Sequence, residues 1–346
     1  MVTDRDLEIL QAVLRYRFIA TSELVRVVGG NEDVTQRRLR YLWEQGLVSR
    51  FAFPGIRTHS EFHYYFDNRR ALDLLATRRL LDIHPLMIQE IKHNREKDYA
   101  GATLSGQHMQ LGFLQHSLMI SRFHFMLEQA CKRPNSGAEL VTFRQGSSVG
   151  GHKVDVPRVI SSRRGNDYLW QETGEVVRLP VEPDALFTLR FGNRLAGEQC
   201  AHFVYEADRG TMVATDMLRK FRAYYHFIKR QQRHKTAFGV HPVRAVLIET
   251  TDEARAKRLM ELVHHPLVAG PNNRAGLFWL TISPLFTDFP EHANGSSPGS
   301  KRYLSEPEAV FERIWALPDR TMLALADMEN SPPSSTVTVP GPLGRR

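Results

Sequence analysis

Two short apolar segments, each bordered by acidic side chains, constrain most strongly how this chain can fold. The first is Pro183–Phe187 and the second, about twenty residues later, is His202–Asp208. The first ends in Ala185, Leu186 and Phe187 and the second contains Phe203, Val204 and Tyr205, apolar and aromatic side chains typical of buried strands. If the two strands are neighbours in one sheet, their acidic ends bring Asp184 and Glu206 together. The sequence therefore predicts paired carboxylates at one end of a sheet.

These carboxylates are candidate ligands for Mg²⁺ or Mn²⁺. Magnesium prefers oxygen donors and is commonly held by one or two protein carboxylates with water and phosphate. Glu206 and Asp208 would share one face of a regular strand, because side chains alternate along it. We expect Asp184, Glu206 and Asp208 to be the metal ligands. The alternative is that Asp208 caps the next helix and pairs with Arg209 or Lys220, while Asp184 only ends its strand.

The charge balance of the chain points to an anionic partner. The 346 residues include 46 Lys and Arg against 38 Asp and Glu, a net charge of +8. Such a balance suits nucleic acid or a membrane surface. No apolar run approaches the ~20 residues that span a bilayer, the start lacks a signal-peptide core, and two cysteines make no disulfide framework. We therefore expect a cytoplasmic protein that does not bind membranes.

Residues 1–80 follow the plan of a winged helix-turn-helix. Apolar residues recur with a helical period over 3–15, and a second short helix follows. Asn31 is placed to cap a third helix and Gly46 to end it. Apolar segments at 47–53 and 62–66 then predict a β-hairpin. A further helix over about 68–80 completes this region.

The third helix carries the candidate contacts to duplex DNA. Leu39, Leu42 and Trp43 recur at core spacing, which directs arginines toward the opposite side. Arginines there can meet phosphates or guanine edges in a major groove. The candidates are Arg37, Arg38 and Arg40 on the helix, with Arg50 and Arg57 beside the hairpin. The alternative is a winged helix that binds protein, on which arginines only keep the surface solvated.

The remaining sequence predicts an α+β domain with one mixed sheet. Residues 81–108 form a polar connector, and 109–320 give the order helix, strand, inserted hairpin, two strands, helix, strand, helix, strand. The helix after the acidic strands, over about 215–233, is strongly basic, which favours contact with a nucleic-acid backbone. It could equally be a core helix with a solvated basic face. Residues 321–346 are rich in Ser, Pro and Gly and predict a disordered tail.

The chain resembles the replication-relaxation family of plasmid and mobile-element proteins over roughly residues 4–320. The resemblance rests on Leu114–Leu118 with its central His116, on Pro183-Asp184, on Tyr205–Thr211 and on Leu218–Tyr224. It implies a role in plasmid replication and DNA relaxation, with double-stranded DNA as partner. Replication or mobilisation proteins and a second copy of the chain are further expected partners. It also implies that His116 lines the site.

The second domain also resembles the restriction-endonuclease-like fold. In that fold one strand carries Pro-Asp and the next carries Glu-x-Lys. Asp184 and Glu206 match the two acids, but Asp208 stands where lysine is expected. Lys220 on the following helix is the candidate replacement, with Arg209 as a second. The catalytic set implied is Asp184, Glu206, Lys220 and His116, and Arg209 and Arg222 are added to the DNA contacts.

Together these features predict a DNA-binding protein that acts in plasmid or mobile-element replication, relaxation or mobilisation. One alternative is a metal-dependent nuclease or nickase of the same architecture. Another is a winged-helix transcriptional regulator whose second domain makes only oligomer contacts. Dependence on Mg²⁺ or Mn²⁺ separates the enzyme from the other two, and relaxation of supercoiled plasmid separates the nickase from a repressor.

Overall fold

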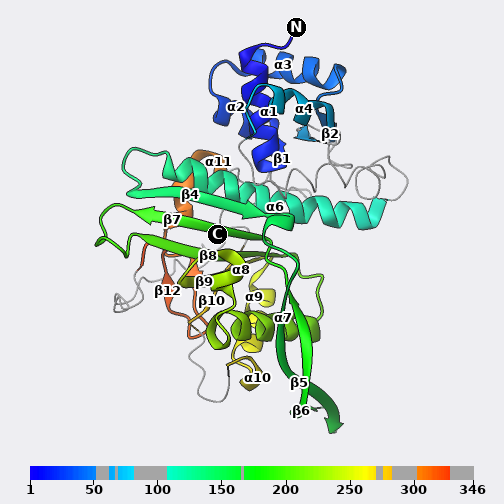
Figure 1. Ribbon diagram of the computed structural model, residues 1–346, viewed down its shortest axis with the longest axis vertical. Coiled ribbons are helices and arrows are strands. Elements are labelled where there is room, and N and C mark those ends of the chain that lie inside the picture. Colours follow the sequence, from blue (N-terminus) through cyan, green and yellow to red (C-terminus); the bar gives the residue numbers. More distant parts are fainter. Residues whose placement is uncertain are drawn as a thin grey trace, which may run out of the picture.

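The computed structural model describes residues 1–51, 62–66, 69–81, 107–164, 167–269, 276–282 and 302–327. It combines helices with a mixed multi-stranded sheet, which confirms the predicted α+β class. A helical N-terminal part stands at one end of the molecule, and a layered sheet part lies below it (Figure 1).

The N-terminal part contains helices and a small antiparallel sheet with strand order β1-β3-β2. Its elements are α1 (Asp4–Tyr16), β1 (Phe18–Ala20), α2 (Thr21–Val28), α3 (Glu32–Glu44), β2 (Ser49–Phe51), β3 (His63–Tyr65) and α4 (Arg69–Thr77). Asn31 caps α3 as predicted, since its Oδ1 accepts a hydrogen bond from Val34 N at 3.1 Å. Gly46 follows the helix with a positive φ of 63°, where glycine carries no Cβ penalty.

The core of this part forms where α1 packs against α2 and α3. Leu10 and Val13 of α1 and Leu39 and Leu42 of α3 are completely buried. Trp43, which the helical spacing placed in the core, is instead 42% exposed. It lies at the edge of the apolar stripe, where its ring covers the guanidinium of Arg50 rather than the core.

The sheet part is built on seven strands in the order β12-β11-β10-β9-β8-β7-β4. Strand β7 is antiparallel to both of its neighbours, β4 and β8, whereas β9 and β10 run parallel to β8. The strands are β4 (Ala138–Gln145), β7 (Ala185–Phe191), β8 (Cys200–Asp208), β9 (Val243–Thr250), β10 (Phe278–Ile282), β11 (Trp315–Ala316) and β12 (Met322–Leu323). The predicted insertion is a long two-stranded ribbon, β5 (His152–Arg164) and β6 (Asp167–Val181), which projects from the body (Figure 1).

Helices cover both faces of this sheet. Their bounds are α6 (Gln107–Cys131), α7 (Ala214–Tyr225), α8 (His234–Phe238), α9 (Glu253–Val263), α10 (Pro266–Ala269) and α11 (Arg302–Ser305), with a short 3₁₀ turn at Pro307–Phe311. Phe187 and Tyr205 belong to the core shared with α6, and the Tyr205 ring stacks on Phe123 at 4.0 Å. Leu186 and Val204 belong to the core shared with α7 and α9. The alternation along β8 therefore directs Glu206 toward α7.

Two boundaries differ from the sequence prediction. The basic helix was expected to run to about residue 233, but α7 ends at Tyr225 and continues as a π-helical turn, His226–Arg230. The tail was expected from residue 321, yet β12 pairs with β11 and Leu325 is completely buried. Most of the predicted connector, the hairpin turn with Arg57, and residues 328–346 of the predicted tail lie outside the described residues.

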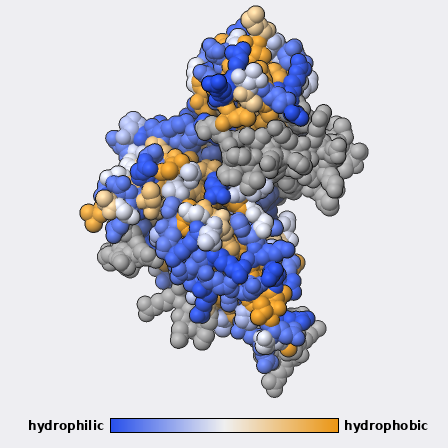
Figure 2. All heavy atoms as spheres, viewed as in Figure 1, coloured by the Kyte–Doolittle hydropathy of each residue, from blue (hydrophilic) through white to orange (hydrophobic). Residues whose placement is uncertain are grey.

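Helix α6 joins the two parts through buried polar contacts. Glu128 accepts hydrogen bonds from the Tyr16 hydroxyl and from Arg15 Nη1, the latter at 2.9 Å. The Ser121 hydroxyl donates to the Tyr16 carbonyl oxygen at 2.6 Å. No helix within the described ranges is long and apolar enough to cross a membrane. The surface in this view is mostly hydrophilic with scattered apolar patches, which by themselves indicate no partner (Figure 2).

Candidate functional site

Strand pairing brings the predicted acidic ends together. Ala185 of β7 lies opposite Tyr205 of β8, so Asp184 reaches the end of the β8 acidic segment. Asp184 Oδ2 accepts a hydrogen bond from the Ala207 backbone N–H at 2.8 Å. Its carboxylate is thereby fixed at the same sheet end as Glu206.

His116 approaches Asp184 from α6, on the other face of the sheet. Its Nε2 lies 3.1 Å from Asp184 Oδ1, and its side chain is 33% exposed. Burial opposes the charged imidazolium, but the Asp184 carboxylate outweighs this effect and raises the pKa of His116. Burial opposes charge on Asp184 as well, yet His116, Lys220 and the Ala207 N–H lower its pKa to about 2. The dyad is thus an ionised carboxylate beside an imidazole that readily takes a proton.

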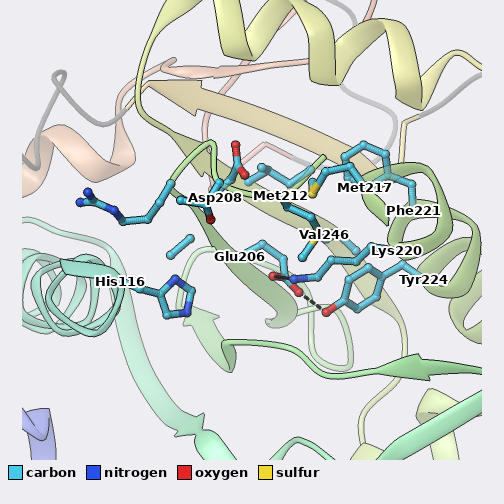
Figure 3. A pocket seen from close by; sticks show the side chains of 13 residues that line it. His116, Glu206, Asp208, Met212, Met217, Lys220, Phe221, Tyr224 and Val246 are labelled. Atoms are coloured by element: carbon cyan, nitrogen blue, oxygen red, sulfur yellow. Dashed lines mark hydrogen bonds and ion pairs between the residues drawn. The ribbon is translucent and has the colours of Figure 1, made fainter. Parts of the chain in front are cut away.

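Lys220 and Tyr224 reach Glu206 from α7. They lie four residues apart and therefore on one face of the helix. Lys220 Nζ donates to Glu206 Oε2, and the Tyr224 hydroxyl donates to Oε1 (Figure 3). The sequence prediction contained Lys220 but missed Tyr224, whose signal was only its spacing from Lys220.

Burial dominates the electrostatics of Glu206, which is 5% exposed. Burial raises its pKa, the Lys220 ammonium lowers it, and the neighbouring Asp184 carboxylate raises it again, to about 8. Burial disfavours the charged form of Lys220, but Glu206 and Asp184 together raise its pKa. Two carboxylates therefore share one lysine, and additional positive charge would be stabilised here.

A cavity of about 430 Å³ adjoins this cluster. His116, Glu206 and Lys220 line one side of it, and Met217 and Phe221 of α7 line another (Figure 3). His116, Asp184, Glu206 and Lys220, the predicted catalytic set, thus meet at one sheet end from four different elements or their flanks.

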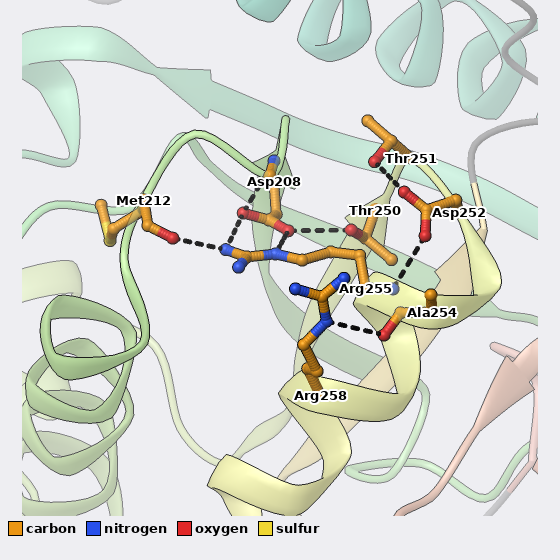
Figure 4. A network of polar contacts seen from close by, with 9 residues as sticks. Asp208, Met212, Thr250, Thr251, Asp252, Ala254, Arg255 and Arg258 are labelled. Atoms are coloured by element: carbon orange, nitrogen blue, oxygen red, sulfur yellow. Dashed lines mark hydrogen bonds and ion pairs between the residues drawn. The ribbon is translucent and has the colours of Figure 1, made fainter.

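Asp208 does not join this cluster through its hydrogen bonds. Its carboxylate receives Arg255 Nε at 2.8 Å, Arg255 Nη2 at 2.9 Å and the Thr250 hydroxyl at 2.8 Å (Figure 4). Arg255 Nη2 also donates to the Met212 carbonyl oxygen at 3.0 Å. Asp208 is therefore paired, as one alternative held, but with Arg255 rather than with Arg209 or Lys220. Arg255 lies in the first turn of α9, 47 residues further along the chain, and no local pattern connects it with Asp208.

The predicted arginines of α3 differ in their surroundings. Arg37 and Arg40 are exposed on the surface of the helix. Arg38 instead directs its guanidinium to Asp6, a buried residue, with Nε to Oδ1 at 2.7 Å. Arg50 lies against Trp43, with its guanidinium carbon 3.8 Å from the ring centroid. Arg57 lies outside the described residues.

The two predicted arginines of the sheet part also have local partners. Arg209 Nη2 donates to Gln115 Oε1 of α6. Arg222 is 3% exposed and donates to the Leu267 carbonyl oxygen at 3.0 Å and to Glu172 Oε1 at 3.0 Å. The expected role of Arg222 as a DNA contact is not supported, because a buried guanidinium that holds the ribbon and α10 offers no surface to a duplex.

Asp184 and Glu206 are the two carboxylates of this cluster that the prediction of a metal site requires. Within the described part of the chain, no three His, Cys, Asp or Glu side chains gather in a group that could hold a metal ion. Asp184 and Glu206 still match the one or two protein carboxylates typical of Mg²⁺. Each carboxylate offers about four lone-pair positions, so the observed hydrogen bonds leave lone pairs unused on both. Asp208, already held by Arg255, adds nothing to this pair.

Fold and site together define an α+β protein in which an acid–lysine–histidine cluster at a sheet end is joined to a helical N-terminal part. The family model for replication-relaxation matches residues 10–243, more than half of the chain. The chain belongs to the replication-relaxation family, and this membership points to a role in plasmid or mobile-element replication or relaxation. No curated protein and no solved structure matches the chain.

Proposed function

We propose that this chain binds double-stranded DNA through its N-terminal part, in the replication, relaxation or mobilisation of a plasmid or other mobile element. The observation that carries the proposal is the two-sided character of α3. Leu39 and Leu42 are completely buried, whereas Arg37 and Arg40 on the other side are exposed. In this proposal the part is a winged helix, α3 enters the major groove, and β2 and β3 flank the adjacent backbone.

The protein would act in the cytoplasm, with replication or mobilisation proteins and a second copy of the chain as further partners. Phosphate contacts would supply most of the affinity, because each neutralised phosphate releases counterions. Arg38 has a different role from its neighbours. Its bond to the buried Asp6 ties α3 to α1 and orients the helix that carries Arg37 and Arg40.

The salt dependence of duplex binding tests this proposal. Replacing Arg37 and Arg40 by alanine should weaken binding and lower the slope of log affinity against log salt by about 0.9 for each lost phosphate contact. The matched control removes two exposed arginines of the sheet part, Arg133 and Arg190, which are 49% and 45% exposed. Equal affinity and slope in wild type and the α3 variant would refute a DNA-binding role for this helix.

A second candidate function is metal-dependent nicking of DNA. The specific observation in its favour is Lys220 beside Glu206, which supports the view that this lysine replaces the one missing at Asp208. Asp184 and Glu206 would hold Mg²⁺ or Mn²⁺, which when bound lowers the pKa of a water and polarises a phosphoryl oxygen. Lys220 would stabilise negative charge on the phosphoryl oxygens. His116, with its raised pKa, could deliver a proton to the departing oxygen.

Relaxation of supercoiled plasmid in the presence of Mn²⁺ tests the second function. Lys220→Ala should abolish nicking, while duplex affinity stays within about twofold because α3 is unchanged. Lys229→Ala is the matched control, since Lys229 is an exposed lysine just beyond the end of α7. Nicking by Lys220→Ala at the wild-type rate would refute the role of this lysine. A wild-type protein that binds duplex but never nicks would identify the sheet part as a module that only holds DNA.

A further inference from the structure

The cavity beside the acidic cluster has an apolar side that phosphodiester chemistry does not require. Met212, Met217, Phe221, Val246 and Ile248 contribute to its lining. A phosphate and its sugar are bound by polar groups, which the charged side chains on the opposite side of the cavity supply and this side does not. The apolar side therefore fits a different chemical group from the one the acidic cluster would meet.

The size and the side-chain types suit a flat aromatic group. The volume of about 430 Å³ falls within the ~300–1,000 Å³ of small-molecule sites. Phe221 offers a ring that is held in place by Phe278, with ring centroids 5.1 Å apart. Met212 and Met217 offer thioethers, which make favourable contacts with aromatic rings. Enzymes that take a base from a duplex hold it between aromatic and apolar side chains of this kind.

Polar groups of the same lining could read the edge of such a ring. Glu206, Lys220 and Tyr224 all line the cavity and offer both donors and acceptors. The side chains of His116 and Lys220 are 33% and 26% exposed, so both reach toward solvent from this lining. Cationic groups there would face the phosphates on either side of an inserted base, which matches the charge of a nucleic-acid strand.

The loop between β8 and α7 forms the exposed edge of the cavity. Thr211 and Met212 line the cavity and are exposed. Arg255 Nη2 holds the Met212 carbonyl oxygen at 3.0 Å, and Arg209 ties the start of the loop to Gln115 of α6. The Asp208–Arg255 pair thus fixes the mouth of the cavity.

We propose that this cavity receives a single nucleobase turned out of duplex DNA, with Met212, Met217 and Phe221 against the base and Glu206, Lys220 and Tyr224 at its edge. This inference rests on the proposed DNA-binding function and names a subsite within it. Extrusion costs least at a mismatched pair, because such a base is already poorly stacked and paired. The protein should therefore favour a mismatched duplex over a matched one.

The test uses the full chain and 2-aminopurine, a base whose fluorescence rises when it leaves the stack. The chain is titrated into a labelled duplex that carries 2-aminopurine opposite a mismatched base, and anisotropy of the same sample reports binding. We expect a several-fold fluorescence rise at saturation. Met212→Trp, which fills the entrance at a 37% exposed position, should remove the rise. Leu195→Trp, at a 75% exposed position in the turn at the other end of β7 and β8, should retain it.

Each outcome decides a separate point. Duplex binding without a fluorescence rise in wild type, or an undiminished rise in Met212→Trp, would overturn the nucleobase site and leave the α3 proposal intact. Absence of duplex binding would overturn the proposed function itself. Binding of the free 2-aminopurine nucleoside with the affinity of the duplex would also overturn extrusion, because the cavity would then serve a small molecule.

Discussion

Replacing Glu128 by glutamine should loosen the contact between the N-terminal part and α6. The Glu128 carboxylate accepts hydrogen bonds from Arg15 Nη1 at 2.9 Å and from the Tyr16 hydroxyl, and pairs with Lys132 Nζ at 2.6 Å. Burial raises its pKa, but Lys132, Tyr16, His124 and Arg15 together lower it from 4.5 to about 2. At ~1.36 kcal/mol per pKa unit this difference corresponds to about 3 kcal/mol.

The expected loss is smaller than that figure. The Glu128 side chain is 12% exposed, but Arg15 and Lys132 are 34% and 54% exposed, so solvent screens part of the attraction. Glutamine also keeps the shape and one acceptor oxygen. We therefore expect Glu128→Gln to lower the free energy of unfolding by about 2 kcal/mol at pH 7, measured by urea denaturation.

The pH dependence gives the sharper check. Because the folded pKa of Glu128 is lowered, its contribution is fully present above the unfolded value of 4.5 and is lost as the pH falls toward about 2. The gap between wild type and Glu128→Gln should therefore close over this range. Glu139→Gln, an exposed partner of Arg190, is the control and should change stability by at most ~0.5 kcal/mol. A gap below ~0.5 kcal/mol at pH 7, or one that persists at low pH, would refute the reasoning.

Two further predictions concern the sheet part. Arg255→Ala leaves the 8% exposed Asp208 without its ion-pair partner and should lower the free energy of unfolding by about 3–5 kcal/mol, measured by thermal or urea unfolding. Arg258→Ala, which removes an exposed arginine of the same helix, should change it little, and equal stabilities of the two variants would contradict the pairing. Mn²⁺ binding at pH 7 should release protons, because burial raises the pKa of Glu206 and a metal would hold its ionised form. Calorimetric heats should therefore vary with the ionisation enthalpy of the buffer and vanish in Asp184→Asn. Heats that are absent in wild type, or unchanged in Asp184→Asn, would speak against a metal at these carboxylates.

The parts of the site that were predictable from the sequence are those set by local periodicity. Alternation along β8 and the pairing of sequential strands bring Asp184 beside Glu206, and the helical period brings Lys220 back to the same sheet end. These relations need only strand and helix geometry. The predicted metal set and catalytic roles stay predictions.

Pairings between distant segments could not be predicted. Asp208 meets Arg255 only because β8 and β9 are adjacent and α9 begins above them. The sequence predicted the same surface role for Arg38 as for its exposed neighbour Arg37, but the Arg38 guanidinium donates to the buried Asp6 of α1. Arg222 lies in a basic run and is nevertheless buried by the ribbon and α10. In each case the partner is specified by tertiary packing and leaves no mark on the local sequence.

Hydrogen exchange of the full chain with and without duplex DNA tests the central claim most directly. If α3 enters the duplex and the sheet part holds it, two segments should gain protection, Glu32–Glu44 and the loop 209–213 between β8 and α7. Arg37→Ala with Arg40→Ala should lose both effects at the same DNA concentration. Protection confined to other surfaces, or none at saturating duplex, would contradict the proposal that this chain binds DNA.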